Sequence, residues 1–509
     1  MQTHFPSGVG SGNGAGLVLA PFHGVRYDLS RVGGLANVTS PPYDVIGPGT
    51  LERLLAASPY NVVRLILPTY APGWTGAGDP AGGGELGAGS PADGSQAGGD
   101  QAGGDQAGGD LGDGNVVDGE LVAAARAAGE VAAARLGDWL TEGALAVDGV
   151  PALYVYEQRG ADWVQRGLIG LVAVGTGAVH PHEGVMAGPV AGRRELMKAT
   201  RSNLEPILLV YNGGAAEVAG GAAGADGVSR VEGAAGESWG SPAGSASGLV
   251  DRTAESQQPV ARAVTDDGVT HRLWAVTDPA VQATIAADLS TRTALIADGH
   301  HRYAAYRELQ AEMHAAGAGP GPWDYGLAFM VDADAYPLRL GPIHRVLPRL
   351  APDDAARRAA GAFTVTDLPG DLDAALCALE RAAGHGTAFL LAGGDGFRLL
   401  TDPDRGRLAA AMPLRTSPRW RALDASVMQE LLLAQLWSIK DNVRDVLISH
   451  DAAEAVRTAA DTGGTAVICN PMPLAAVMDI AAHGEQVPRK STSFGPKPRT
   501  GLVLRTFDA

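Results

Sequence analysis

Apolar residues occur along the chain both in short runs of strand length and in longer segments of helical composition. Short apolar runs between turn residues predict strands, and segments rich in Ala, Glu, Arg and Leu predict helices. The predicted strands are 61–67, 152–158, 168–174, 206–211, 273–276, 293–297, 325–331, 466–469 and 502–504. The predicted helices are 120–140, 374–382, 424–436 and 474–483. This mixed order predicts an α/β or α+β fold rather than a helical bundle or a β-sandwich.

Two glycine-rich stretches interrupt this pattern. Residues 73–119 contain three tandem copies of Gln-Ala-Gly-Gly-Asp, and residues 213–256 are rich in Gly, Ala and Ser. Neither stretch has many large apolar side chains to bury, so both are expected to be disordered inserts. They leave an N-terminal part of the folded body (1–72), an α/β core segment (120–212), a core segment with the main motif (257–350) and a C-terminal α+β domain (351–509).

Charge narrows the possible partners. The net charge is −17, which argues against nucleic acid or an anionic membrane as the main partner. Nine of the acidic residues fall between Thr75 and Glu120, where there is no Lys or Arg, so a local basic pocket remains possible elsewhere. No run of 18 apolar residues and no signal peptide occur, so we expect a cytoplasmic protein. The oligomeric state stays open.

The segment Ala294–Arg302 carries the clearest chemical signal. An apolar strand ends at Asp298, Gly299 permits a tight turn, and a helix is expected to follow. A helix N-terminus favours phosphate, but it disfavours cations such as His300, His301 and Arg302 unless an anion sits among them. The alternative is that one histidine caps the helix and Arg302 pairs with a surface carboxylate.

Three further segments carry candidate ligand-binding residues. In His180-Pro-His182-Glu183, Glu183 can act as a general base or a Mg²⁺-associated carboxylate, or the loop can simply be solvated. The prolines of 40–46 fix a loop that positions Tyr43 and Asp44 over a ligand, or that only covers the core. The donor-rich loop 490–497 can grip phosphate, or form a basic surface loop. Candidate phosphate contacts outside the main motif are Arg26, His344, Arg345, Lys490, Ser491 and Lys497.

The sequence resembles a known family in five segments that occur in the same order. These segments, 40–46, 182–183, 297–303, 341–346 and 488–497, look like those of the domain-of-unknown-function 1015 (DUF1015) family. The Asp-Gly-His-His-Arg block is similar to the signature of the ParB/sulfiredoxin superfamily. Among the members of this superfamily, the free-serine kinases have the most similar motif. The resemblance implies a ParB/sulfiredoxin-like nucleotide-binding core with α+β elaborations. It also implies a nucleotide-phosphate site at Asp298–Arg302. Sulfiredoxin chemistry needs a cysteine in this block, and none is present.

The combined prediction is a kinase that uses ATP or ADP with Mg²⁺ to phosphorylate a hydroxylated metabolite such as free serine. Asp298 or Glu183 would deprotonate the acceptor, with Glu183 also a weak candidate ligand for Mg²⁺. His300 would assist catalysis, and Gly299, His301 and Arg302 would hold the nucleotide. Tyr43, Asp44 and His182 would contact the acceptor. Two alternatives remain open: a nucleotide-binding regulatory protein without turnover, and a phosphatase of a small phosphorylated metabolite.

Overall fold

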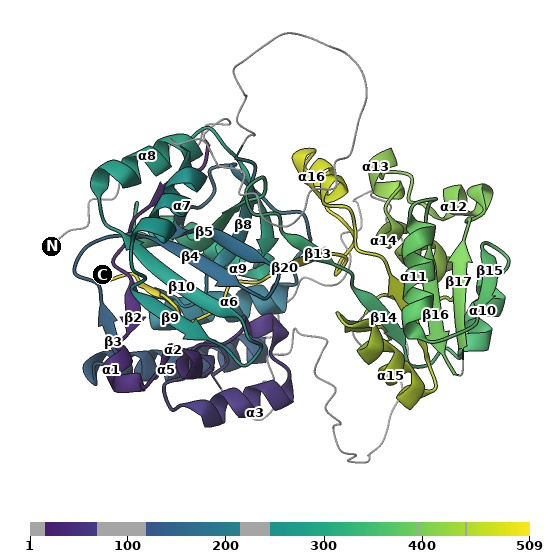
Figure 1. The fold of residues 1–509 in the computed structure, drawn as a ribbon, viewed down its shortest axis with the longest axis horizontal. Helices are drawn as coiled ribbons and strands as arrows, with labels where there is room; N and C mark the ends of the chain where they lie inside the picture. Colours follow the sequence, from purple (N-terminus) through teal and green to yellow (C-terminus); the bar gives the residue numbers. More distant parts are fainter. Residues whose placement is uncertain (1–15, 69–118, 214–244, 395, 443–444, 509) are drawn as a thin grey trace, which may run out of the picture.

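Two β-sheets divide the protein into two lobes that lie side by side (Figure 1). The computed structural model describes residues 16–68, 119–213, 245–394, 396–442 and 445–508. The predicted fold class, mixed α/β, is confirmed.

The first lobe is built on a nine-stranded sheet. Its order is β6 (Val179–His180), β11 (Ala294–Asp298), β8 (Ile207–Tyr211), β12 (Tyr325–Asp332), β5 (Val164–Ala173), β4 (Leu153–Arg159), β10 (Thr270–Val276) and β9 (Ala261–Val264), with β1 (Leu19–Ala20) also paired to β5. The pairs β6–β11 and β8–β12 are parallel, and the other pairs are antiparallel.

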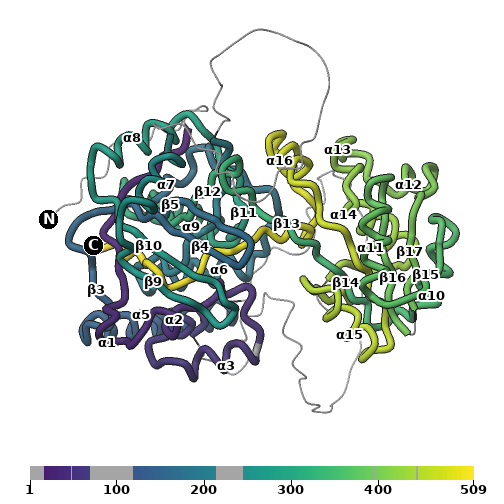
Figure 2. The backbone as a smooth tube through the Cα atoms, in the orientation of Figure 1, coloured from purple at the N-terminus to yellow at the C-terminus, as the bar shows by residue number. Residues whose placement is uncertain are grey.

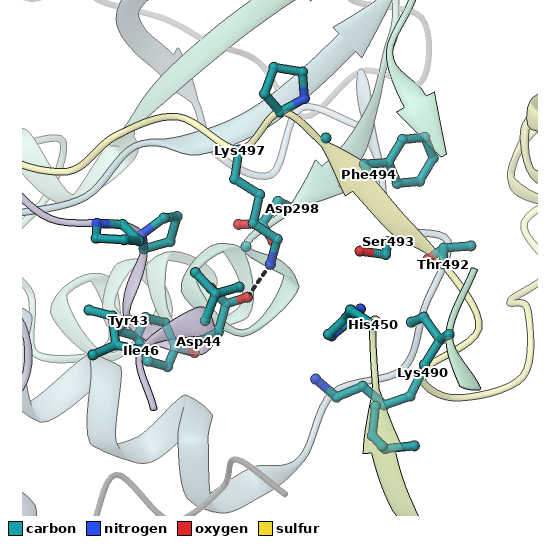
Figure 3. A pocket seen from close by; sticks show the side chains of 18 of the residues that line it. Tyr43, Asp44, Ile46, Asp298, His450, Lys490, Thr492, Ser493, Phe494 and Lys497 are labelled. Carbon is teal, nitrogen blue, oxygen red and sulfur yellow. Dashed lines mark hydrogen bonds and ion pairs between the residues drawn. The ribbon is translucent and has the colours of Figure 1, made fainter. Parts of the chain in front are cut away.

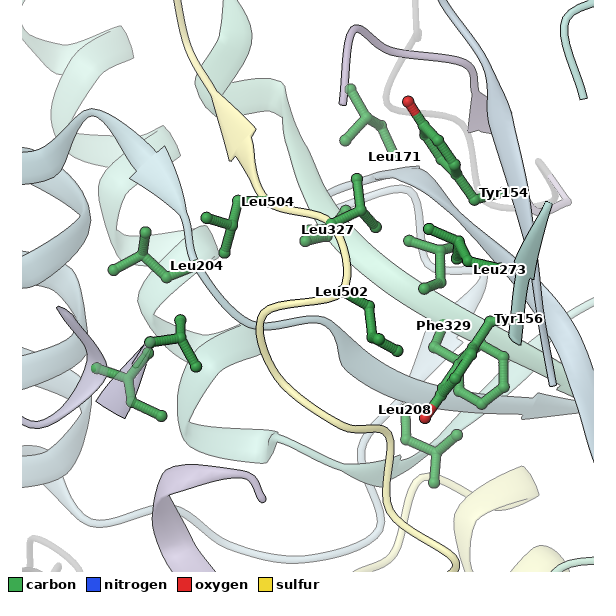
Figure 4. Close-up of a cluster of buried hydrophobic side chains, with 14 of the residues drawn as sticks. Tyr154, Tyr156, Leu171, Leu204, Leu208, Leu273, Leu327, Phe329, Leu502 and Leu504 are labelled. Carbon is green, nitrogen blue, oxygen red and sulfur yellow. The ribbon is translucent and has the colours of Figure 1, made fainter. Parts of the chain in front are cut away.

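Both faces of this sheet are buried at its centre, which explains why the strands β8, β11 and β12 are almost continuously apolar rather than alternating. In β4, Tyr154 and Tyr156 face one core cluster, which Figure 4 shows, and Leu153 and Val155 face the other. The first cluster includes side chains of α2 (Leu35–Val38), α4 (Val63–Ile66), α5 (Gly119–Thr141) and α16 (Leu474–Ala482). The second includes α7 (Ala246–Ser256), α8 (Pro279–Leu289) and α9 (His300–Ala315), and α6 (Ala187–Thr200) contributes to both. Shorter helical pieces of this lobe are α1 (Leu29–Val32), η1 (Tyr43–Val45), α3 (Pro48–Ala57) and η2 (Pro322–Asp324).

The second lobe has a six-stranded sheet, again with a core cluster on each face. Its order is β15 (Thr364–Leu368), β17 (Gly396–Thr401), β16 (Phe389–Gly393), β19 (Thr465–Cys469), β14 (His344–Leu347) and β18 (Leu447–Ser449). Its helices are α10 (Pro352–Ala359), α11 (Leu372–Ala383), α12 (Arg405–Ala411), α13 (Pro418–Arg421), α14 (Asp424–Val427), the π-helix η3 (Met428–Leu436) and α15 (Ala452–Thr462).

Three two-stranded pairs complete the fold. They are β2 (Val25–Tyr27) with β3 (Leu145–Val147), β7 (Ser202–Asn203) with β21 (Arg505–Thr506), and β13 (Arg339–Gly341) with β20 (Ser493–Gly495). The β13–β20 pair lies where the chain leaves the first lobe and where it returns, and Figure 2 traces the returning segment in yellow.

Most predicted strands and helices are confirmed, including the long helix at 120–140 and the strand pair β4–β5. The predicted strand at 61–67 is wrong: Asn61 Oδ1 accepts from the Val63 amide at 3.0 Å and the helix α4 follows. Val63, Leu65 and Ile66 are all buried, so this short helix has no polar face and its sequence does not show the periodicity of a helix. The predicted strand at 502–504 is a single bridge from Leu504 to Val25, followed by β21.

The predicted segment boundaries need three corrections. Residues 246–256 are not a disordered insert, because they form α7, which buries Ala246, Val250 and Thr253. The second lobe begins before 351, since β14 already belongs to its sheet. Residues 502–504 lie in the core of the first lobe, not in a C-terminal domain. Residues 73–118 and 214–244 of the predicted inserts lie outside the described residues.

Among the described residues, no helix combines the length and the apolar character needed to cross a bilayer.

Candidate functional site

A cavity of about 1220 Å³ is lined by residues from both lobes. The first lobe supplies the loop 41–50, the loop after β6 and the β11–α9 junction, and the second supplies the end of β18 and the start of α15. The segment 489–499, which passes from one lobe to the other, forms a further wall. The predicted site residues that line it are Tyr43, Asp44, Glu183, Asp298, Gly299, His300, His301, Arg302, Lys490 and Lys497.

The strand–turn–helix motif forms as predicted. β11 ends at Asp298, Gly299 has a left-handed φ of 93°, and α9 begins at His300. A Cβ atom at Gly299 would lie 2.8 Å from Ile207 Cγ2, so both the backbone conformation and the available space require glycine. The first turn of α9 therefore lies on the cavity wall.

Carboxylates of the protein already pair with two of the predicted phosphate-binding cations (Figure 3). Lys497 Nζ lies 2.6 Å from Asp44 Oδ2 and 2.7 Å from Asp298 Oδ1. Arg302 Nη2 donates to Asp298 Oδ2 at 2.5 Å, and Arg302 Nη1 donates to the Pro206 carbonyl at 2.6 Å. Burial favours a neutral Asp44, but the charges of Lys497 and Arg302 outweigh it and hold its pKa below the usual range. Arg302 thus pairs with a carboxylate, as in the alternative that the sequence left open, but this carboxylate is buried rather than on the surface.

A second ionic layer supports this chain of ion pairs. Arg193 Nη1 lies 3.5 Å from Glu205 Oε2, and its guanidinium lies 4.1 Å from the centre of the Tyr43 ring. The Tyr43 amide donates to Glu205 Oε1 at 3.1 Å, which fixes the loop 41–46 against the core. Burial raises the pKa of Glu205, and the arginine charges oppose it.

The histidines near the motif are neutral. His300 Nε2 and His182 Nδ1 are 3.2 Å apart, and His182 Nε2 lies 2.8 Å from Thr492 Oγ1. His301 Nε2 accepts from the Met186 amide at 3.1 Å. Burial lowers the pKa of His182 and His301 to about 4, and that of His300 well below its usual value. Without a bound anion, these low pKa values mean that His300 and His301 offer polar atoms rather than charge to the cavity. Their role as cations beside a bound anion stays a prediction.

Glu183 is held differently from the other carboxylates. Its Oε1 accepts from the backbone amide of Lys490, and we find no ion pair for it within the described residues. Burial raises the pKa of Glu183, while the Lys490 charge partly opposes the rise. A carboxylate with a raised pKa in a cavity has the property expected of a general base.

Five predicted site residues do not line the cavity, because protein groups already hold their side chains: Arg26, His182, His344, Arg345 and Ser491. Arg26 pairs with Asp148 at 2.6 Å, and His344 Nδ1 accepts from the Cys469 amide at 3.2 Å. Arg345 donates to the Lys490 carbonyl at 2.9 Å, and Ser491 Oγ to the Pro488 carbonyl at 2.5 Å. The structure therefore does not support direct contacts of these five residues with a ligand, although Arg345 and Ser491 hold the backbone of the cavity wall at 488–490.

Some cavity residues were not predicted. His450 follows β18, Trp163 lies in the turn between β4 and β5, and Arg499 Nε donates to Thr39 Oγ1 at 2.8 Å. None of them stands in a chemical motif, so only the packing of distant segments reveals them.

A metal ion carried by a nucleotide has one clear candidate ligand. Among the described residues, no group of three or more His, Cys, Asp or Glu is arranged to hold a metal. Mg²⁺ needs only one or two carboxylates when phosphates supply its other ligands. Asp44 Oδ1 is buried and has no partner among the described residues, so it fits this role, whereas Glu183 Oε1 already accepts a hydrogen bond.

These features define a two-lobed, mixed α/β protein with a charged cavity formed by both lobes. The family described as "Protein of unknown function (DUF1015)" matches residues 19–77, 119–224 and 241–426, and the chain belongs to this family. No curated protein matches the chain.

Several solved structures are similar at low identity. A free serine kinase in complex with AMP is 14% identical, with 62% of this chain and 84% of that chain covered and a TM-score of 0.30. A conserved hypothetical protein from Pyrococcus furiosus is 14% identical, with 64% and 90% covered and a TM-score of 0.29. SbnI with C-terminal truncation from Staphylococcus aureus is 10% identical, with 66% and 87% covered and a TM-score of 0.32.

Proposed function

We propose that the protein is a phosphotransferase that moves a phosphoryl group from ATP or ADP to the hydroxyl of a small metabolite. The observation that carries this proposal is a cavity in which the N-terminus of α9 and cationic side chains share the walls with a carboxylate of raised pKa. Phosphoryl transfer needs mainly positioning, charge neutralisation and one base.

Glu183 is the base in this proposal. Asp298 is engaged with both Lys497 and Arg302, so a proton on Asp298 would break two ion pairs. Glu183 makes no such pair among the described residues, and its raised pKa makes its carboxylate a better proton acceptor than an ordinary glutamate. Asp298 is then a residue that fixes Lys497 and Arg302.

In the proposed reaction, Glu183 accepts the proton of the acceptor hydroxyl as the oxygen attacks the terminal phosphorus. The bond between that phosphorus and the bridging oxygen breaks, and the shortened nucleotide leaves with the electron pair. Lys490 and the amides at the start of α9 bind the phosphate oxygens. Asp44 would hold Mg²⁺, which supplies neutralisation of phosphate charge.

Turnover is tested by incubating the protein with ATP or ADP, Mg²⁺ and a pool of amino and hydroxy acids. Release of the shortened nucleotide should accompany a phosphorylated acceptor, free serine being the first to examine. Nucleotide binding without turnover over a broad panel would favour a regulatory protein. Release of inorganic phosphate from phosphorylated metabolites would favour a phosphatase.

The base assignment is tested with Glu183→Gln, which keeps the size of the side chain but cannot accept the proton. Turnover should fall by about 10²–10⁴, while nucleotide affinity measured by titration calorimetry should change little. Glu308→Gln, on the exposed side of α9, is the matched control and should keep full activity. Unchanged turnover in Glu183→Gln would remove Glu183 from the reaction.

A further inference from the structure

Lys490 has a strained backbone that both lobes hold in place. Its φ of 54° lies in the left-handed region, which is unfavourable for a residue other than glycine. Glu183, from the first lobe, accepts from its amide, and Arg345, from β14 of the second lobe, donates to its carbonyl at 2.9 Å. Such strain is typical of residues whose side chain must occupy one position for function.

The ammonium group of Lys490 is free to bind a ligand. It makes no ion pair or hydrogen bond with any residue that the structure describes, although it lines the cavity. The charges of Lys497 and Arg302 are matched by Asp44 and Asp298. Lys490 therefore supplies positive charge on the cavity wall that no carboxylate side chain within the described residues pairs with.

His450 lies beside Lys490 on the wall of the second lobe. Figure 3 shows the two side chains on the same side of the cavity, with Tyr43 and Asp44 on the other. The imidazole makes no hydrogen bond to any described residue. Loss of water lowers the pKa of His450, the charges of Lys497 and Lys490 lower it further, and the charge of Asp44 opposes them.

We propose that Lys490 and His450 together form a subsite for a doubly charged phosphate group, with His450 as a residue that contacts the ligand. This inference deepens the proposed function and rests on it for the identity of the ligand as a nucleotide. It assigns the second lobe a direct part in binding, because His450 belongs to that lobe. This residue lies between β18 and Asp451, the N-cap of α15.

Binding at this subsite should be coupled to protonation. A dianion offsets the repulsion from Lys490 and Lys497, so it favours the imidazolium form of His450. The other groups that act on His450 are Asp44, Arg345 and His344, and Glu183 lies against the Lys490 backbone. Affinity should therefore rise as the pH falls through the pKa of the liganded imidazole, and level off below the pKa of the free one.

Sulfate is the best probe, because it stays a dianion across this pH range while phosphate itself titrates. We expect sulfate to bind about tenfold tighter at pH 6 than at pH 8 in the wild type. This change corresponds to a rise of about one unit in the pKa of His450 when sulfate binds. His450→Gln should weaken binding at pH 6 by about tenfold and lose most of this pH dependence. His385→Gln, on an exposed residue after α11, should behave as the wild type.

A second variant separates charge from folding. His450→Lys keeps a positive charge, so it should bind sulfate at both pH values with little pH dependence. A wild-type pH slope in either His450 variant would overturn the subsite. The assay needs no turnover: sulfate binding through His450 in a protein that transfers no phosphoryl group would contradict the proposed function and leave the subsite standing.

Discussion

At the scale of single residues, the site is dominated by charges that satisfy one another. Arg302 is almost fully buried, with 3% of its surface exposed, and it binds both Asp298 and the Pro206 carbonyl. A guanidinium in this position stabilises the turn after β11 and neutralises a carboxylate that also binds Lys497. Arg302 is thus part of the fold as well as of the cavity wall.

Replacing Arg302 with Ala should therefore unfold the protein more readily, because Asp298 would stay buried with one partner fewer. The expected loss in the free energy of unfolding is about 3–5 kcal/mol, measured by urea denaturation. Arg307→Ala, on the exposed side of the same helix, is the control and should cost less than about 0.5 kcal/mol. A stable Arg302→Ala variant would mean that water or a rearranged cation replaces the guanidinium.

At the scale of elements, the junction of β11 and α9 depends on one glycine. Gly299→Ala should destabilise the protein by about 1–3 kcal/mol, because φ is 93° and the new Cβ would meet Ile207. A Cβ atom added at Gly192, inside α6, would meet no other atom within 4 Å, and the φ of Gly192 is not left-handed. Gly192→Ala should stabilise by up to about 1 kcal/mol, so thermal melts of the two variants should shift in opposite directions.

The elements also show what local sequence can reveal. The junction at Asp298 and Gly299 was predictable because an apolar run, a glycine and helical periodicity occur together. The helix α7 was not, since it is short and follows a long stretch of Gly, Ala and Ser. His450 was missed because its place in the site depends on how the second lobe packs against the first.

At the scale of the whole molecule, one carboxylate marks where the second predicted insert joins the fold. The Gly213 amide donates to Asp332 Oδ1 at 2.9 Å, and the Ser247 hydroxyl donates to Asp332 Oδ2. The ends of the segment 214–244 are therefore held at the same residue. A short linker could join them without disturbing β8 or α7.

Deleting 214–244 and joining the ends with a few glycines should shift the melting temperature by only a few degrees, because loop closure depends weakly on loop length. Extending the deletion to 256 removes α7, with its buried Val250 and Ser247, and should lower the melting temperature much further. Differential scanning calorimetry compares the two. An equal effect of both deletions would show that α7 contributes little.

The path of the chain between the lobes bears on how the protein is made. All strands of the second sheet lie between His344 and Cys469, whereas Leu502, Val503 and Leu504 complete the core of the first lobe. On the ribosome, the second lobe can thus emerge whole while the first still lacks residues 502–504 and the strand β21. The lobe that carries the Asp298 motif therefore needs chain segments from both sides of the second lobe to complete its core, so the cavity can form only after residues 502–504 have been made.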